Sequence, residues 1–91
     1  MKINGLLAES KEIGWPKSNI YEIVVRMGKV FGDICRYARN AKKDKVLHTD
    51  NELKKELGNM IFCSIRWCDD LGYDPEECIK LAIDCQKKFE K

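Results

Sequence analysis

The sequence predicts an all-α protein, and three observations support that prediction. Apolar residues recur at three- and four-residue steps in several segments, which is the spacing of an amphipathic helix. The longer segments begin with residues typical of a helix N-terminus. No segment shows a convincing alternation of apolar and polar residues, the pattern of a half-buried strand. A chain of 91 residues has the length of one domain, so we treat residues 1–91 as a single helical domain.

The first two helices are separated by a proline-containing segment. Apolar residues on one side of residues 3–12 predict a short first helix. Residues 14–17, Gly-Trp-Pro-Lys, end it, because proline disfavours helical geometry at the residue before it. Asn19 followed by Glu22 has the spacing of a capping box and opens a second helix that ends near Asn40. Its apolar stripe consists of Ile20, Ile23, Val24, Met27, Val30, Phe31, Ile34 and Ala38.

The third helix follows a basic, polar linker at residues 41–48. Thr49 and Glu52 have capping-box spacing, and Gly72 is a natural stop. Residues 60–68 are apolar nearly all round, so this helix should be buried on several sides. In a domain this small the expected second cover is a partner subunit. We therefore expect a homodimer formed through the third helix.

A fourth helix begins after Asp74. An acceptor at the cap, proline at the first helical position and two acidic residues near the positive end of the dipole make a strong helix start. One apolar stripe then follows, made of Cys78, Leu81, Ala82, Cys85 and Phe89. The sequence thus predicts a bundle of four helices.

Charge and composition argue against several classes of partner. The net charge of +2 is too small to indicate nucleic acid, and a basic stretch at residues 36–45 is more typical of a solvated helix end. No apolar run approaches the ~20 residues of a membrane-spanning helix, so no membrane partner is expected. The N-terminal segment lacks the apolar core of a signal peptide, which favours a cytoplasmic location.

Five cysteines are many for this length. An odd count without an export signal argues against a disulfide framework. No Cys-x-x-Cys pair is present, and His48 has no cysteine at zinc-finger spacing. We therefore expect most of the cysteines to be small buried apolar residues.

Two polar ridges stand out, because residues three or four apart lie one above the other on a helix. If the second and third helices run antiparallel, as a short connection favours, these ridges can meet. The ridge on the second helix is Arg26, Lys29, Asp33 and Arg36, and that on the third is Glu52, Glu56, Asn59 and Arg66, with Cys63 between them.

In order and spacing, most of the chain resembles the MazG-like all-α nucleoside triphosphate pyrophosphohydrolases. The matching pieces are Gly14-Trp15, Asp70-Leu71-Gly72, Asp74-Pro75-Glu76-Glu77 and the two ridges. In that family a Glu-x-x-Glu faces a Glu-x-x-Asp on the next helix, and these carboxylates hold Mg²⁺ against the phosphates of a nucleotide. Here Glu56 matches. Asn59 replaces the aspartate, and Arg26 and Lys29 replace the first two glutamates, so three of the four carboxylates are missing.

The resemblance therefore implies a nucleotide-binding module with a degraded metal site, or an interaction protein, and leaves enzymatic activity open. The partner would be a nucleotide or a nucleotide-derived small molecule, with phosphates contacted by Arg26 and Lys29. No cofactor is expected in that case. The alternative is a Mg²⁺-dependent hydrolase that releases pyrophosphate. Its metal ligands would come from Glu56, Asn59, Glu52 and Asp33.

Two purely structural interpretations of these residues compete with these functions. Arg26 and Lys29 could simply pair with Glu56 and Glu52 in salt bridges across the bundle, each contributing ~0–1 kcal/mol. Large aromatic side chains such as Trp15 and Trp67 can stack on a base, but they are more typical of a core or an interface.

Overall fold

The computed structural model describes residues 2–40 and 49–89, and this part of the chain contains helices and no strand. The predicted all-α class and the four predicted helices are confirmed. The predicted linker at residues 41–48 lies outside the described residues. The helices are α1 (Ile3–Glu12), α2 (Ile20–Asn40), α3 (Asp50–Asp70) and α4 (Pro75–Phe89).

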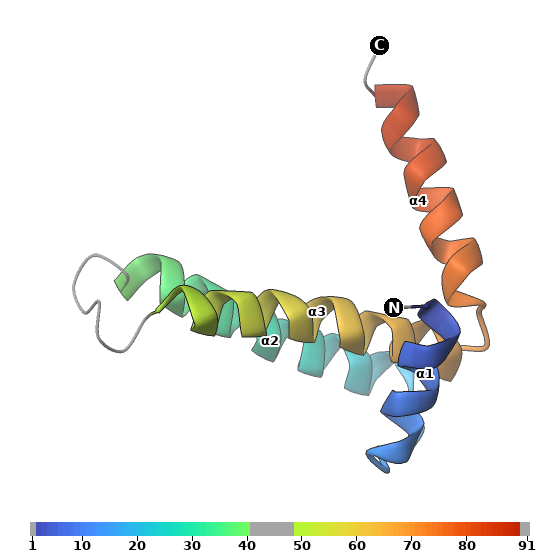
Figure 1. Ribbon diagram of the computed structural model, residues 1–91, viewed down its shortest axis with the longest axis horizontal. Helices are drawn as coiled ribbons and strands as arrows, with labels where there is room; N and C mark the ends of the chain where they lie inside the picture. Colours follow the sequence, from blue (N-terminus) through green and yellow to red (C-terminus); the bar gives the residue numbers. More distant parts are fainter. Residues whose placement is uncertain (1, 41–48, 90–91) are drawn as a thin grey trace.

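Helix α3 is the centre of the molecule, since α1, α2 and α4 all pack against it. Figure 1 shows α2 and α3 side by side and antiparallel, as the sequence suggested. The best-buried apolar side chains are Ile23 of α2 and Ile65 and Trp67 of α3, each at most 5% exposed. Ile65 and Trp67 of the apolar middle of α3 are thus covered within the chain, whereas Ile61 of the same stretch is 65% exposed. Dimerisation stays a prediction.

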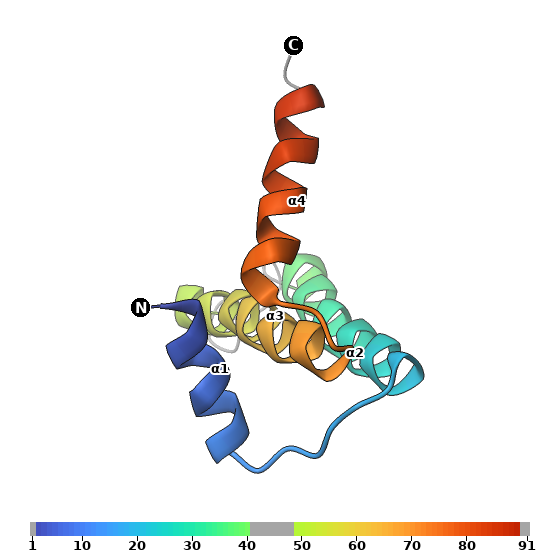
Figure 2. The ribbon, with the colours of Figure 1, turned by 90° about the vertical axis from the view of Figure 1, so that its right-hand side faces the viewer.

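Helix α4 packs against α3 and then points away from the α2–α3 pair in both ribbon views (Figures 1 and 2). Its large apolar side chains are consequently exposed, from 41% for Ile79 to 80% for Phe89. Apart from Cys78, which is half-buried, the predicted apolar stripe of this helix is therefore exposed within the chain. Among the described helices, none combines the length and the apolar character needed to cross a bilayer.

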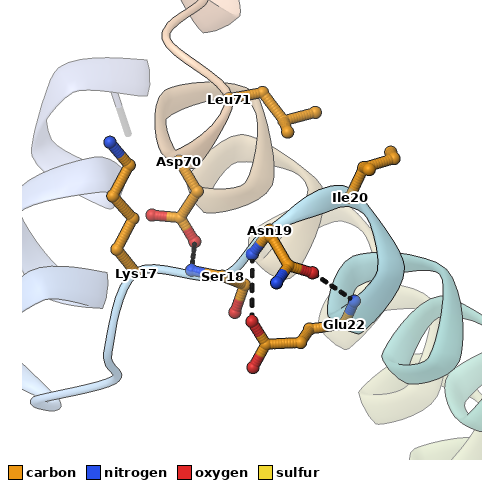
Figure 3. Close-up of a pocket in the computed structure, with 7 residues that line it drawn as sticks. All are labelled: Lys17, Ser18, Asn19, Ile20, Glu22, Asp70 and Leu71. Carbon is orange, nitrogen blue, oxygen red and sulfur yellow. Dashed lines mark hydrogen bonds between the residues drawn. The ribbon is translucent and has the colours of Figure 1, made fainter.

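The predicted helix caps are confirmed. At the start of α2, the Glu22 backbone N–H donates to Asn19 Oδ1 (3.0 Å), and the Asn19 N–H donates to Glu22 Oε1 (3.2 Å), as Figure 3 shows. Thr49 Oγ1 accepts from the Glu52 N–H at 3.3 Å, and Asp74 caps α4 in the same way. These side chains satisfy backbone donors that the first turn of a helix leaves without partners.

The turn between α3 and α4 is a Schellman motif. Gly72 adopts a left-handed conformation (φ 86°). Its N–H donates to the Asp69 carbonyl, and the Tyr73 N–H donates to the Cys68 carbonyl, both at 2.9 Å. These two bonds are the pair that defines the motif. They fix where the chain leaves α3, and with the Asp74 cap they fix where α4 begins.

A buried ion pair ties the N-terminal segment to α3. Arg66 Nε donates to Asp70 Oδ1 at 2.8 Å, and both residues are at most 7% exposed. The same guanidinium donates to the Ser10 carbonyl (3.1 Å) and the Trp15 carbonyl (2.7 Å). Asp70 Oδ2 accepts the Ser18 backbone N–H at 3.1 Å (Figure 3). We call these contacts the Arg66 network.

The Arg66 network corrects one prediction. The sequence places Arg66 on the polar ridge of the third helix, with Glu56 and Asn59. In the structure its side chain is buried against α1 and the segment that follows α1. A guanidinium is buried when several acceptors satisfy it, and here a carboxylate and two backbone carbonyls do so. Two of these acceptors come from residues more than 50 positions away, which no local spacing rule includes.

Candidate functional site

The two polar ridges meet at an open pocket of about 360 Å³ between α2 and α3. We call it the α2–α3 pocket. Because the helices are antiparallel neighbours, residues three and four apart on each helix face the same hollow. The chain between α1 and α2 adds one tryptophan to the wall. The lining residues are Trp15, Arg26, Lys29, Val30, Asp33, Glu56, Asn59, Cys63 and Trp67.

Five of the six predicted site residues line this pocket, namely Arg26, Lys29, Asp33, Glu56 and Asn59. Glu52 does not. It lies one turn before Glu56, its side chain is 51% exposed, and it pairs with Lys55 at 2.9 Å. The hydrogen bond to Glu52, and then its charge, raise the pKa of Lys55.

The carboxylates of the pocket already have basic partners. Asp33 Oδ1 pairs with the Arg36 guanidinium at 2.8 Å, and Glu56 Oε1 lies 3.7 Å from Lys55 Nζ. Sequence could have found the Asp33–Arg36 pair, because its spacing is i,i+3. Lys55 and Glu56 are adjacent, and no helix-spacing rule pairs such neighbours. One of the alternatives from the sequence paired Glu56 with a base of the opposite helix instead.

Arg26 and Lys29 remain without partners. Within residues 2–40 and 49–89, neither side chain makes a hydrogen bond or an ion pair. The alternative in which they form salt bridges with Glu56 and Glu52 across the bundle is therefore wrong for this structure. Two exposed cations project from adjacent turns of α2 at a hollow surface. That arrangement can accept a multiply charged anion.

The rest of the wall is aromatic and apolar. Trp67 is 5% exposed, and half-buried Trp15 meets the Phe62 ring edge-on with centroids 5.9 Å apart. Burial raises the pKa of the Cys63 thiol, which the charge of Arg26 lowers by a smaller amount. Cys63 is therefore a neutral part of the wall at neutral pH. Val30, which the sequence places in the apolar stripe of α2, also lines the pocket, and the helical spacing did not predict that role.

The donor set does not fit Mg²⁺. In the described part of the chain, no three His, Cys, Asp or Glu side chains lie close enough together to hold a metal ion. Of the four predicted ligands, Glu52 is outside the pocket and Asn59 offers only a neutral oxygen. Mg²⁺ requires hard oxygen ligands, usually carboxylates with phosphate and water. Arg26 and Lys29 at the same surface would oppose it.

Comparisons of the chain with protein-family models, with curated proteins and with solved structures gave no match. The MazG-like resemblance thus stays a prediction, and it rests on the residues quoted for it. The description of the fold and of the pocket rests on the structure of this chain alone.

Proposed function

We propose that the protein binds the phosphate groups of a nucleotide in the α2–α3 pocket, without a metal ion and without hydrolysis. One observation carries the proposal. Arg26 and Lys29 are unpaired, whereas the neighbouring carboxylates Asp33 and Glu56 are each paired with another base. Arginine binds phosphate through two parallel hydrogen bonds, and lysine adds a point charge. The positive charges of Arg26 and Lys29 are therefore not neutralised by the acidic residues of the pocket.

The aromatic wall supports a nucleotide over a simple anion. Trp15 and Trp67 border the same hollow as the two cations. A base can lie against an indole while the phosphates reach the basic residues, since aromatic stacking tolerates any base. The pocket volume of about 360 Å³ falls within the usual range for small-molecule sites, roughly 300–1,000 Å³.

A thermal-shift titration with a nucleoside triphosphate and with inorganic triphosphate tests the proposal, each with and without Mg²⁺. A ligand of the folded state raises stability in proportion to RT ln(1 + [L]/Kd). We expect the nucleotide to stabilise the protein without Mg²⁺ and to bind more tightly than triphosphate. Arg26→Gln should weaken binding about tenfold or more, because a hydrogen bond to a charged group is worth ~1.5–3 kcal/mol. Arg39→Gln is the matched control, an exposed arginine of α2 outside the pocket.

The same experiment separates the alternatives. A shift that requires Mg²⁺, accompanied by release of pyrophosphate, would support the hydrolase, for which Asp33 and Glu56 are the acids present in the pocket. No shift with any nucleotide would remove the nucleotide proposal and favour an interaction protein.

We also propose that the protein works as a homodimer. An apolar groove of about 410 Å³ lies on α2 and α3, lined by Val24, Met27, Gly28, Phe31 and Met60. The exposed apolar face of α4 is a second uncovered surface in the same chain. A second copy supplies a cover for both surfaces at once, because each copy carries one groove and one such helix. Exposed apolar surface of this extent is typical of interaction sites.

A further inference from the structure

Two of the five cysteines, Cys68 and Cys78, lie on either side of the α3–α4 junction. All those in the described chain are free thiols. Cys35 and Cys85 are exposed, whereas Cys63, Cys68 and Cys78 are half-buried. The expectation that most cysteines are buried is therefore wrong. It fails because the faces of α2 and α4 that carry Cys35 and Cys85 are uncovered within the chain.

The backbone fixes the relative positions of Cys68 and Cys78. The Cys68 carbonyl accepts the Tyr73 N–H in the Schellman motif, so Cys68 lies in the last turn of α3. The Cys78 N–H donates to the Asp74 carbonyl at 3.1 Å, which places it in the first turn of α4. The two helices pack against each other at this junction. Within α4, Pro75 and Cys78 are the only residues that are not exposed, so Cys78 lies at the contact with α3.

We propose that Cys68 and Cys78 form a reversible disulfide, with a small-molecule disulfide such as glutathione disulfide as the oxidant. The disulfide would covalently link the first turn of α4 to the last turn of α3. A disulfide requires the two Cβ atoms to lie about 3.5–4.5 Å apart. The proposal is that the contacting turns of α3 and α4 bring Cys68 and Cys78 to that separation.

The reaction is two successive thiol–disulfide exchanges. The Cys78 thiolate attacks one sulfur of glutathione disulfide, the S–S bond breaks, and one glutathione thiolate leaves. A mixed disulfide then connects Cys78 to the second glutathione. The Cys68 thiol loses its proton to solvent, its thiolate attacks Cys78 Sγ, and the second glutathione leaves as a thiolate. Two protein thiols are oxidised to one disulfide, and one glutathione disulfide is reduced to two glutathiones.

The order of attack follows from the surroundings of Cys68. Burial, and then the hydrogen bond and charge of Cys78, raise the pKa of Cys68 to about 11. Cys68 therefore holds its proton and is the poorer first nucleophile. Once Cys78 is capped by glutathione it can no longer carry a negative charge, so one cause of the raised pKa is removed. Cys68 then acts as the resolving thiol, helped by its fixed position beside the mixed disulfide.

The bond would act on the least supported helix. Helix α4 packs on α3 and points away from the rest of the molecule (Figure 2). A covalent link in its first turn restricts the directions in which α4 can leave α3. The reduced protein would thus allow α4 to adjust to whatever covers its apolar face, and the oxidised protein would hold it in one direction.

The test uses the full chain with Cys35→Ser and Cys85→Ser, which removes the two exposed thiols. The protein is incubated with glutathione disulfide, quenched with acid, digested and analysed by mass spectrometry. We expect a peptide pair linked through Cys68 and Cys78, formed at least about tenfold faster in native protein than in urea, because the fold holds the thiols together. Amide hydrogen exchange in α4 should slow on oxidation, and dithiothreitol should reverse both changes.

Two further variants complete the test. Cys68→Ser should stop at the mixed disulfide on Cys78. Cys78→Ser should leave Cys68 largely unmodified over the same time. A native protein that accumulates only mixed disulfides, that links these cysteines to other sites or to other chains, or that forms the pair no faster than in urea would overturn the proposal.

Discussion

At the scale of single residues, the Arg66 network is the feature that most constrains the fold. One guanidinium satisfies a carboxylate and two backbone carbonyls, and the same carboxylate accepts a backbone N–H. No buried side-chain nitrogen or oxygen of the described residues lacks a partner. A buried ion pair of this kind is costly to disrupt, because each partner has already lost its water.

Arg66→Leu should therefore destabilise the protein strongly. Asp70 would be left buried with the Ser18 N–H as its remaining donor, and removing one partner of a buried pair typically costs ~3–5 kcal/mol. Arg36→Leu is the matched control, since its pair with Asp33 is exposed and such pairs contribute ~0–1 kcal/mol. Urea unfolding followed by circular dichroism measures both. Equal losses would show that Asp70 finds water or another donor.

The thiol of Cys68 makes the stability of the folded protein depend on pH in the alkaline range. Burial and the neighbouring Cys78 raise its pKa from 9.0 to about 11 in the folded protein. Below pH 9 the thiol is protonated in both states, and its effect does not change with pH. Between pH 9 and pH 11 the unfolded chain loses this proton and the folded protein keeps it, so stability falls as pH rises.

Cys68→Ser should flatten this part of the pH profile, because serine does not titrate there. The melting temperature from pH 9 to pH 11, measured under reducing conditions, checks it. Cys35→Ser is the control, since that thiol is exposed. A profile that keeps its slope in Cys68→Ser would mean that other groups, such as Cys63, whose pKa is also raised by burial, dominate it.

At the scale of the helices, local residues determine the ends and tertiary contacts determine the rest. Asn19–Glu22, Thr49–Glu52 and Asp74–Pro75 could be interpreted from sequence because a cap involves residues at most three apart. The same local spacing predicted which polar residues share a face on each helix. It therefore predicted most of the residues that line the α2–α3 pocket. The burial of Arg66 and the direction of α4 depend on residues far along the chain. No spacing rule contains that information.

The same change, glycine to alanine, at Gly72 and at Gly58 tests where α3 ends. Gly72 has φ 86°, a conformation in which a Cβ costs ~1–2 kcal/mol, so Gly72→Ala should destabilise the turn before α4. Gly58 lies inside α3, and a Cβ there meets nothing within 4 Å. Gly58→Ala should stabilise the protein by ~0.5–1 kcal/mol. Chemical denaturation of both variants decides it, and effects of the same sign would contradict the assigned end of α3.

At the scale of the whole molecule, a small core coexists with wide apolar exposure. On α2, Val24, Met27 and Phe31 are 42–60% exposed, and they line the groove that we assign to a second copy. A chain of this length is near the lower limit for burying an adequate core by itself. Association would bury the groove and the face of α4 together.

We expect light scattering at tens of micromolar to give the mass of a dimer. Phe31→Lys should produce monomers, because it places a charge in the apolar groove. Val25→Lys is the control on the same helix, since Val25 is 73% exposed and does not line the groove. A monomeric parent protein, or dissociation by both variants alike, would remove the assigned interface.

The Arg66 network also bears on the order in which the molecule folds. Its bonds to Ser10, Trp15 and Ser18 join residues 51 to 56 positions apart, whereas the caps and the α3–α4 turn join close neighbours. Closing a longer loop costs more chain entropy before any contact repays it, so such contacts tend to form late. If the network forms after the rate-limiting step, its loss should accelerate unfolding and leave the folding rate nearly unchanged. In stopped-flow chevrons of Arg66→Leu, the unfolding limb should rise while the folding limb stays in place. The chain would then dock its own N-terminal helix last, onto a helical pair that is already formed.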